Sequence, residues 1–475
     1  MQVSHTPAAL SISFDDPTLV SAAGLVPVMR LADKAGLSTL AQHRMTVPTD
    51  KGANAGAKIT SLIAGMVAGA DSINDMDQLR HGGMSRLFNR IYAPSTLGSF
   101  LRSFTFGHVR QLDAVASRFL MGLAHQAPGL VPAQAATSSR GRDGGYVFVD
   151  VDDTIIEVHG HQKQGAGFGY SGIRGLNALL ATVTTPESAP VVVAQRLRRG
   201  SCGSPRGADR LIADAITTTR RLPAMDTQKI LMRADSAFYG RPSIHAAITA
   251  GADVSVTARM TRNIRHAITT IPDTSWEAIE YTDALFDEDA QRWISSAEVA
   301  EIPFVAFASK NKADQVPGRL VVRRIPELNK KDIDQPGLFD LHRFHAVFTT
   351  SDPGILDTVA ADKTHRQHAV IEQVNADLKN SALAHMPSGK FNANAAWLVV
   401  AVMAFNLTRT AGVIAAGAMA KATTATIRHR IVAVAARIAR RSRRLVLHLP
   451  KGWTWESQWT RLFIHVHSPP GTVPA

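Results

Sequence analysis

Apolar residues recur at intervals of three and four through much of the first 140 residues, which is the spacing of a helix with one buried face. Residues 58–80 follow this spacing, and so do residues 94–123. The second stretch begins with Pro-Ser-Thr, a favourable helix start. Residues 125–145 are rich in Gly, Pro, Ser and Ala, and are typical of a linker. We therefore predict a helical N-terminal region over residues 1–140.

Strand patterns take over after residue 145. Three apolar, β-rich runs are separated by gaps too short for crossover helices, which predicts an antiparallel meander. A helix, a strand ending at residue 235, a second helix and a strand near 253–260 follow. This order is close to the ribonuclease H-like arrangement, in which three antiparallel strands precede alternating helices and parallel strands. We predict an α/β core whose first part spans residues 145–259.

Residues 260–340 interrupt that alternation. They contain short strand-like runs with charged loops, and a buried strand resumes at 343–352 before a helical stretch. The pattern predicts a β-rich insertion domain over 260–340 and the second part of the core over 341–412. The remaining residues, 413–475, form a basic C-terminal region that we expect to be largely helical, with a disordered end at SPPGTVPA.

The most apolar segment, residues 395–420, resembles a membrane helix at first sight. Asn406, Thr408 and Arg409 interrupt it, leaving an apolar stretch shorter than the roughly 20 residues needed to span a bilayer. We interpret it as a buried helix lying on a sheet. The N-terminus shows no signal-peptide pattern, and a single cysteine, Cys202, excludes a disulfide scaffold within one chain. A cytoplasmic protein with no membrane partner is the expectation.

The charge balance indicates a polyanionic partner. The 475 residues include 52 Lys and Arg against 39 Asp and Glu, a formal net charge of +13. Such a balance favours DNA, RNA or an acidic membrane surface as the partner. Arginines are dense in the C-terminal region between residues 428 and 444.

Three aspartates are the candidates for chemistry in the strands. With a side-chain period of two, Asp150 and Asp152 point to one face of their strand and Asp153 to the other. A carboxylate facing into a sheet is costly unless it is paired, hydrogen-bonded or bound to metal. Asp235 ends a later strand, which in the ribonuclease H-like order lies beside the first, so Asp152 and Asp235 would be neighbours. The plainer interpretation of Asp235 is a strand end followed by a helix cap.

The predicted helix near residue 370 carries one polar stripe at intervals of three and four: His365, His368, Glu372, Asn375 and Lys379. The stripe is either an ordinary solvated face or the source of a third carboxylate, Glu372. Oxygen-only ligands suit Mg²⁺ or Mn²⁺ rather than zinc. Three carboxylates can hold two such ions, the arrangement used for cleavage and transfer of phosphodiesters.

Together these residues give the chain a resemblance to the DDE transposases of bacterial insertion sequences. It is similar in particular to the insertion sequence 1380 group, which is related to the wider insertion sequence 4 group. The motifs that carry the resemblance cover most of the chain: DVDDT at 150–154, GYSGIRGLNALLATV at 169–183, RLRRGS at 196–201, RADSAFY at 233–239, IEQVNADLK at 371–379 and FNANAAWLVVAVMAFNLTR at 391–409.

The resemblance implies a ribonuclease H-like catalytic core interrupted by a β-strand insertion domain before the last acidic helix. It places the catalytic, metal-binding acids at Asp152, Asp235 and Glu372, with Asp150 as the competitor of Asp152. It also implies cleavage at inverted terminal repeats and strand transfer into target DNA with two Mg²⁺ or Mn²⁺ ions. A homodimer on double-stranded DNA is the further expectation.

Further DNA contacts are predicted around the acids. The wider group carries a tyrosine and an arginine before the glutamate and a lysine seven residues after it. Lys379 matches the lysine, whereas histidines stand at the other two positions. Besides these, phosphate or base contacts are predicted for a basic and hydroxyl-bearing set: His365, His368, Arg366, Arg233, Arg198, Arg199, Ser95, Thr96 and Arg102. The last three belong to a candidate recognition helix, for which an ordinary helical bundle is the alternative.

Two other functions fit parts of the pattern. DVDDT after an apolar strand also fits a haloacid dehalogenase-like phosphatase, with Asp150 as nucleophile and Asp152 as acid/base. The strands at 176–195 and the lack of a second acid near Asp235 speak against it. The other alternative is a catalytically inactive DNA-binding protein.

Overall fold

The computed structural model divides into two compact units, which we call the helical unit and the sheet unit. The helical unit joins Met1–Ala127 to Leu378–Ala475, and the sheet unit is Pro128–Asp377. The structure describes residues 4, 6, 9–133, 145–160, 162–287, 292–326 and 342–468. The side chains of 49–50, 280–287, 292–296 and 326 are outside this description. Most of the predicted linker and nearly all of SPPGTVPA lie outside the described residues.

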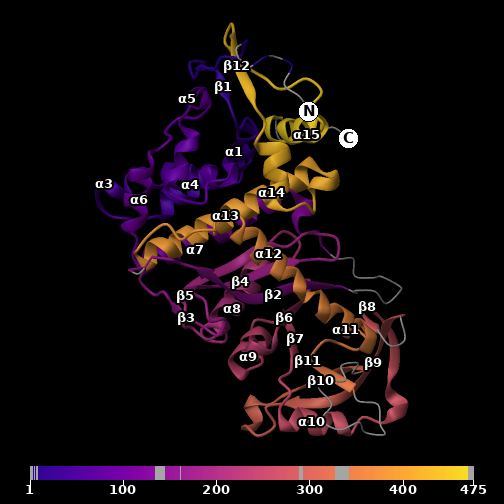
Figure 1. Ribbon diagram of the computed structural model, residues 1–475. Coiled ribbons are helices and arrows are strands. Elements are labelled where there is room, and N and C mark those ends of the chain that lie inside the picture. The colour runs from indigo at the N-terminus through magenta and orange to yellow at the C-terminus, as the bar shows by residue number, and fades with distance from the viewer. Residues whose placement is uncertain are drawn as a thin grey trace. The chain divides into compact units, whose positions relative to one another are not determined.

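The sheet unit is built on one ten-stranded sheet (Figure 1). Along the sheet the strands run β4, β2, β6, β7, β11, β10, β9, β8, and both β5 and the short β3 pair with β4. Their bounds are β2 Tyr146–Glu157, β3 Gly167–Phe168, β4 Arg174–Thr184, β5 Val191–Arg199, β6 Lys229–Ala234, β7 Asp253–Thr257, β8 Glu277–Asp287, β9 Arg292–Ala306, β10 Val316–Pro326 and β11 His342–Thr349.

Strand directions follow the connections between the strands. β4 is antiparallel to both β2 and β5, and no helix lies in either connection among the described residues, as the sequence predicts. β6 is parallel to β2, and β7 is parallel to β6, with helices α8 (Ala208–Arg220) and α9 (Arg241–Thr249) in the connections. Parallel neighbours need such crossovers. The central strand β2 is buried on both faces, which explains its nearly unbroken apolar sequence.

The block at 260–340 does not form a separate layer. β11 pairs antiparallel with β7, and β10, β9 and β8 extend the same sheet by antiparallel pairing. The expected insertion is therefore, among the described residues, a continuation of the core sheet. Helix α10 (Arg262–Thr269) covers this part by packing Ile264 and Ile268 against Leu320 and Val322.

Helices α11 (Thr358–Arg366) and α12 (Val370–Lys379) follow β11, with a 3-10 turn, η8 (Gln367–Ala369), between them. Figure 1 shows α12 crossing the sheet at β2. Shorter 3-10 turns in the sheet unit are η3 Pro128–Leu130, η4 Ser236–Phe238, η5 Asp273–Ser275 and η6 Lys312–Asp314.

The helical unit surrounds one long apolar helix, α13 (Phe391–Ala415). All its residues but Phe391, Asn392 and Val413 are buried, and it packs on α7, α4 and α6. We expected this helix to lie on a sheet; it instead forms the centre of a helical bundle. It is the one helix in the described chain long and apolar enough to cross a membrane, and its burial is that of a core helix. The surrounding helices are α1 Leu25–Lys34, α2 Leu37–Arg44, α3 Thr49–Gly52, α4 Ala55–Ala68, η2 Asn74–Leu79, α5 Met84–Leu87, α6 Pro94–Arg102, α7 Phe106–Gln126, η9 Gly417–Met419, α14 Thr424–Ile427, η10 Arg428–Val432 and α15 Glu456–His467.

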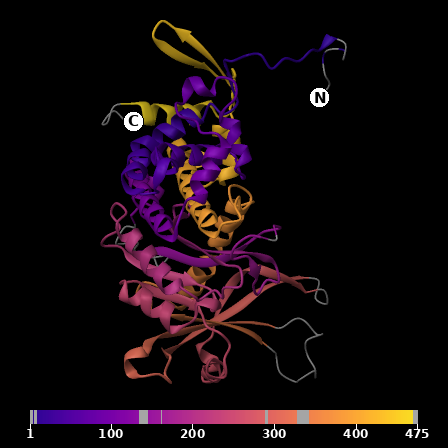
Figure 2. The same cartoon turned by 90° about the vertical axis from the view of Figure 1, so that its left-hand side faces the viewer.

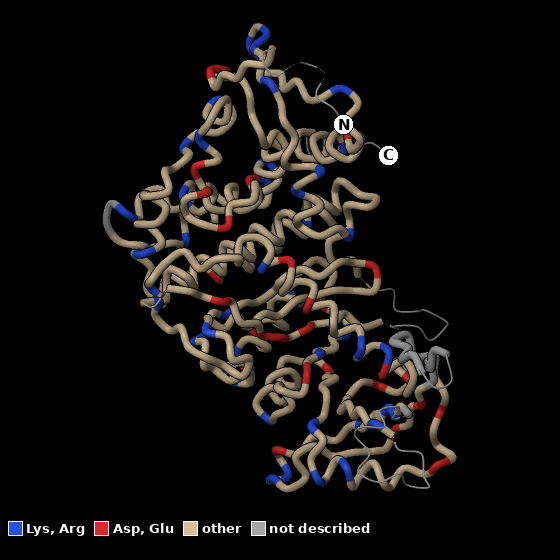
Figure 3. The backbone as a smooth tube through the Cα atoms, viewed as in Figure 1, with Lys and Arg blue, Asp and Glu red and all other residues tan. Residues whose placement is uncertain are grey.

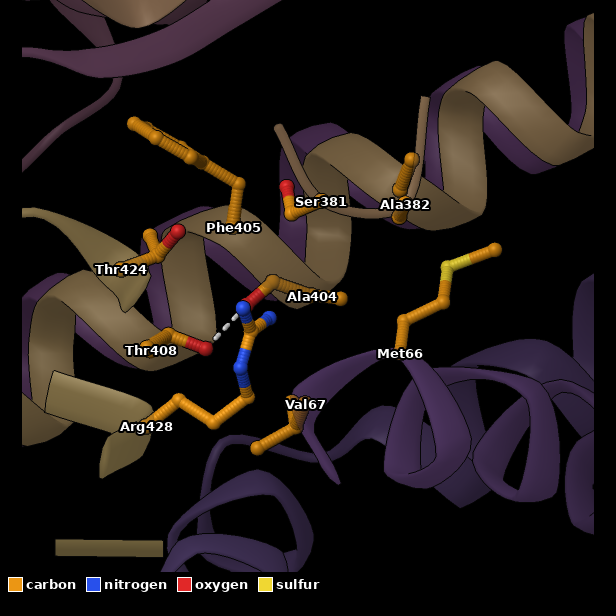
Figure 4. A pocket seen from close by; sticks show the side chains of 10 residues that line it. Met66, Val67, Ser381, Ala382, Ala404, Phe405, Thr408, Thr424 and Arg428 are labelled. Carbon is orange, nitrogen blue, oxygen red and sulfur yellow. Dashed lines mark hydrogen bonds between the residues drawn. The ribbon is translucent and has the colours of Figure 1, made fainter. Parts of the chain in front are cut away.

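A small pocket lies in this bundle beside α13 (Figure 4). Its walls are largely apolar, with Met66, Val67 and Phe405 among them, and the guanidinium of Arg428 reaches into it. The hydroxyl of Thr408 donates to the carbonyl of Ala404 at 2.8 Å. No carboxylate lines the pocket, so it offers no acidic site.

The C-terminal region contains strands in addition to the helices that we expected. β12 (Ala436–Arg441) and β13 (Arg444–His448) form a hairpin, and β12 pairs with β1 (Leu19–Val20) from the start of the chain. The order of this second sheet is β1-β12-β13. A local helical pattern cannot reveal such pairing, since the two partners are separated by more than 400 residues.

Gly24 lets the two chain ends approach each other. It precedes α1, and a Cβ built there would lie 1.9 Å from the carbonyl oxygen of Ile431. Its N–H donates to the carbonyl of Val432 at 3.2 Å. Any side chain at position 24 would push the segment around residue 431 away from α1.

We predict that Gly24→Ala lowers the free energy of unfolding by about 1–3 kcal/mol, because overpacking forces the backbone to shift. Urea unfolding followed by circular dichroism measures the change. Gly107→Ala is the matched control: Gly107 is exposed near the start of α7, and a Cβ there meets only the Thr105 hydroxyl, at 3.8 Å. Equal stability of the two variants would contradict the prediction.

Candidate catalytic site

The centre of the site is an ion pair between two adjacent parallel strands. Asp150 of β2 and Arg233 of β6 are register partners. Arg233 donates from Nε to Asp150 Oδ1 at 2.7 Å and from Nη2 to Oδ2 at 2.8 Å, while its Nη1 donates to the carbonyl of Thr364 at 2.6 Å. Both side chains are buried, and the guanidinium also lies over the ring of Phe148, 4.2 Å from its centroid. Arg233 thus ties β2, β6 and α11 together.

His368 completes the environment of Asp150. Its Nδ1 lies 3.0 Å from Asp150 Oδ1. Burial by itself would raise the pKa of Asp150, but the charge of Arg233 and the hydrogen bonds from His368 and Arg233 outweigh it, and the pKa is lowered. Asp150 is therefore a charged structural residue whose two oxygens are occupied.

Asp152, in the middle of β2, and Asp235, directly after the end of β6, lie close to each other. The β2–β6 ladder ends with Val151 opposite Ala234, and one further residue brings Asp235 level with Asp152. Asp152 is partly buried, whereas Asp235 is exposed and caps η4 by accepting from the N–H of Ala237 at 2.9 Å. Burial, together with the negative charges of Asp153 and Asp235, raises the pKa of Asp152 to about 6. The two carboxylates form an acidic pair.

Helix α12 presents its polar stripe to this pair. Asn375 donates from Nδ2 to Asp152 Oδ2 at 2.8 Å, and His368, just before the helix, contacts Asp150. Glu372 stands four residues after His368 and three before Asn375, so it shares their face. Its side chain is exposed. The structure therefore brings Asp152 and Asp235 together and places Glu372 on the helix face that contacts β2.

The fit of this site to a metal ion follows from its donors. Neither Asp152 nor Asp235 forms an ion pair in the described part of the chain, and both offer only oxygens. A divalent cation such as Mg²⁺ is suited to such a pair. No group of three His, Cys, Asp or Glu side chains in the described residues is close enough to hold a metal ion by itself. Glu372 would have to turn toward the pair to complete a cage.

Asp153 faces the other side of β2 and has a structural role. It accepts from Arg198 Nη2 at 2.6 Å and from Asn177 Nδ2 at 2.5 Å. Arg198 is buried and also donates to the carbonyls of Ser204 and Arg206. The predicted phosphate contact of Arg198 is therefore wrong for this conformation, because its donors are used inside the sheet unit.

Two other predicted DNA contacts are also buried. Arg233 donates instead to Asp150 and to the carbonyl of Thr364. His365 lies between two hydroxyls of β7, with Nδ1 2.9 Å from Ser255 Oγ and Nε2 2.8 Å from Thr257 Oγ1. Burial, the nearby His368 and Arg233 lower its pKa to about 3. A neutral, enclosed imidazole cannot serve as a cation for phosphate.

The remaining predicted contacts are more accessible. Arg199 is exposed at the end of β5, and Ser95, Thr96 and Arg102 are exposed on α6 of the helical unit. Arg366 donates to Asp362 at 3.0 Å and is partly exposed. Lys379 ends α12, is partly buried and belongs to the helical unit.

Tyr170, which the sequence patterns did not indicate, lies near enough to the acidic pair for their charges to affect its phenol. Its side chain is 78% exposed, yet its pKa is raised by partial burial of the phenol oxygen and by the charges of Asp153, Asp152 and Asp235. An exposed aromatic ring beside carboxylates suits stacking against a nucleic-acid base. The available signal was the motif that begins at Gly169, which carries this tyrosine into the turn before β4.

A family model described as the transposase DDE domain, group 1, matches residues 4–468. The chain belongs to this transposase family. The match spans almost all of the transposase, from the N-terminal segment to the end of α15. No curated protein matches it. Transposases of this family act on DNA, so DNA is the substrate of this protein. The family generally uses divalent metal ions as cofactors.

We predict that Arg233→Gln destabilises the transposase by about 3–5 kcal/mol, because a buried carboxylate then loses its counter-ion. Urea unfolding monitored by tryptophan fluorescence measures the loss. The double variant Asp150→Asn/Arg233→Gln should recover part of it, since no charge is left unpaired. Stability of the double variant equal to or below that of Arg233→Gln would argue against the ion pair as the cause.

A second prediction concerns pH. The pKa of His365 is depressed from 6.5 in the unfolded chain to about 3 in the fold, so its contribution to stability is present above pH 6.5. The contribution is lost as the pH falls from 6.5 toward 3, because only the unfolded chain takes up the proton. The stability difference between wild type and His365→Gln should shrink by about 1.4 kcal/mol per pH unit below pH 6. Denaturation curves at pH 7, 6 and 5 measure it, and parallel pH profiles would refute this assignment.

Proposed function

We propose that the protein cleaves DNA at the inverted terminal repeats of an insertion sequence and joins the freed 3′ ends to target DNA. The observation that carries the proposal is the level placement of Asp152 and Asp235 on adjacent parallel strands, next to a helix that bears Glu372 on its facing stripe. Asp152 is the first catalytic aspartate in this proposal, since Asp150 is fully buried and bound to Arg233.

We infer a ribonuclease H-like core from the order of five strands. The strands β5, β4, β2, β6 and β7 are neighbours in this order across the sheet. β4 is antiparallel to both β5 and β2, whereas β6 and β7 run parallel to β2. In chain order this is three antiparallel strands followed by two parallel ones with helical crossovers. Placement within the insertion sequence 1380 group, related to the insertion sequence 4 group, rests on the motifs of the sequence alone.

Asp152, Asp235 and Glu372 would hold Mg²⁺ or Mn²⁺, and two ions fit the chemistry of the proposal. Bound ions would activate the attacking water or hydroxyl and stabilise the leaving 3′ oxygen. The protein's own side chains prepare the site: Asn375 orients the carboxylate of Asp152 by a hydrogen bond, and the pair Asp150–Arg233 fixes the strand below it.

DNA contacts in the proposal come from exposed residues of both units. Tyr170 and Arg199 serve in the sheet unit, and the exposed face of α6 serves in the helical unit. The hairpin of β12 and β13 adds exposed arginines at its end, visible as the blue tip in Figure 3: Arg440, Arg441, Arg443 and Arg444. Each phosphate contact makes binding more sensitive to salt. A homodimer acting on two element ends in the bacterial nucleoid completes the proposal.

The burial of Asp150 bears on the phosphatase alternative. A phosphatase nucleophile must reach a phosphorus atom, whereas Asp150 has no exposed surface and both its oxygens accept hydrogen bonds. A catalytically inactive DNA-binding protein would bind the same DNA but would not cleave it. A cleavage assay therefore distinguishes this alternative from the proposal.

We predict that Asp152→Asn, Asp235→Asn and Glu372→Gln each reduce cleavage of a DNA fragment carrying the element end by at least about 10³-fold, because removing a member of a catalytic unit removes most of its rate advantage. Cleavage with Mg²⁺ is followed on sequencing gels, and DNA binding by gel shift should persist. Glu157→Gln, at the far exposed end of β2, is the matched control and should keep wild-type cleavage. Wild-type cleavage by any of the three variants would remove that residue from the catalytic set.

A further inference from the structure

The segment before β1 exposes apolar residues in a strand-like pattern. Leu10, Ile12 and Phe14 are 62%, 85% and 100% exposed, and serines separate them. Figure 2 shows this segment running away from the helices and strands of its unit. An alternating apolar pattern is typical of a strand with one buried face. We call residues 10–14 the arm.

The same unit contains an apolar groove of about 750 Å³. One wall is β13 with the residue after it, and the others come from α1, α15 and the end of α5. Val26, Met29, Phe88 and Phe463 contribute apolar surface, and Leu445 is 54% exposed. An exposed apolar surface of this kind marks an interaction site.

The groove follows an open edge of a sheet. β13 pairs with β12 on one side, and no described strand pairs with its other side. Leu445, Leu447 and Leu449 recur with a period of two and all line the groove. An edge strand beside apolar pockets is the usual acceptor of an added strand, in which main-chain hydrogen bonds give affinity and alternate side chains fill the pockets.

The arm and β13 are complementary when paired antiparallel. If Ile12 lies opposite Leu447, the other two apolar residues of the arm lie opposite Leu449 and Leu445. The same register brings Asp15 opposite Arg444, which is exposed and has no ion pair among the described residues. In this one register the three apolar residues of the arm lie opposite leucines of the groove, and a carboxylate lies opposite a guanidinium.

The arm of the same chain is poorly placed to reach this edge. Thr18 is fixed beside β12, because its carbonyl accepts from the N–H of Ile438 at 2.8 Å. Asp16 holds a turn there by accepting from the N–H of Thr18 at 2.7 Å. A strand added to β13 would lie three strand spacings from β1, about 14 Å. The four residues from Phe14 to Thr18 span at most about 14 Å when fully extended, and the turn at Asp16 shortens them.

We propose that the arm of one copy pairs with β13 of a second copy and fills its groove, and that the exchange is reciprocal. Leu10, Ile12 and Phe14 are then buried in the partner, and the open edge of β13 is covered. Reciprocal exchange of identical elements gives a closed twofold dimer at low cost. The interface needs neither DNA nor the carboxylates, so it stands apart from the proposed catalysis.

Oligomeric state in the absence of DNA tests the exchange. Light scattering after size-exclusion chromatography should give twice the 51.1 kDa of one chain for wild type and a single chain mass for Ile12→Asp/Phe14→Asp. The arm variant alters only residues that are exposed in the structure, so folding is preserved. Ile248→Asp/Val305→Asp, which alters two partly exposed apolar residues of the sheet unit, is the matched control and should stay dimeric. A monomeric wild type, or a dimeric arm variant, overturns the proposal.

Disulfide trapping identifies which copy supplies the arm. In a Cys202→Ser background, chains carrying only Ile12→Cys are mixed with chains carrying only Leu447→Cys and oxidised. A cross-linked species of twice the chain mass on a non-reducing gel is expected. Absence of that species, or an internally bridged monomer formed by the double variant Ile12→Cys/Leu447→Cys, overturns the exchange between copies. Because no DNA or metal is present, loss of cleavage activity has no bearing on either result.

Discussion

The ion pair between Asp150 and Arg233 is the interaction on which the rest of the site depends. It joins β2 to β6 by two hydrogen bonds and β6 to α11 by a third. Two parallel strands are set in register by it, and the next level of that register holds Asp152 and Asp235. An unpaired charge at either position would be strongly destabilising, because both side chains are buried away from solvent. The pair therefore fixes register because any slip would leave both charges without partners.

The three aspartates of β2 differ in role because each has different neighbouring side chains. Asp150 and Asp152 share a face of β2, yet the first is enclosed by Arg233 and His368 while the second is partly exposed and lies beside Asp235. Asp153 faces the other side and binds Arg198 and Asn177. One short acidic motif thus supplies a structural ion pair on each face and a third carboxylate, Asp152, that forms no ion pair among the described residues.

The helical unit shows a different constraint, the joining of distant chain segments. α13 is almost wholly buried among helices from the first 127 residues, and β1 pairs with the hairpin of β12 and β13. Gly24 permits the close backbone contact at this junction. The same sheet leaves β13 as an open edge beside an apolar groove, and the exposed arm lies in the unit that carries that groove. Pairing of β13 with the arm of a second copy would bury both the apolar residues of the arm and the apolar groove.

The sequence by itself determined the local features: the helical N-terminal stretch, the meander of β2, β4 and β5, the shared face of Asp150 and Asp152, and the polar stripe of α12. These depend on side-chain periods of two and 3.6, which are properties of neighbouring residues. Only the tertiary structure decided that Asp150 rather than Asp152 is enclosed, that Arg198 and His365 are buried, and that β8 to β10 extend the core sheet. It also decided that α13 lies among helices and that the C-terminal region contains a hairpin. The reason is physical: burial and ion pairing depend on partners tens to hundreds of residues away, and a local pattern carries no record of them.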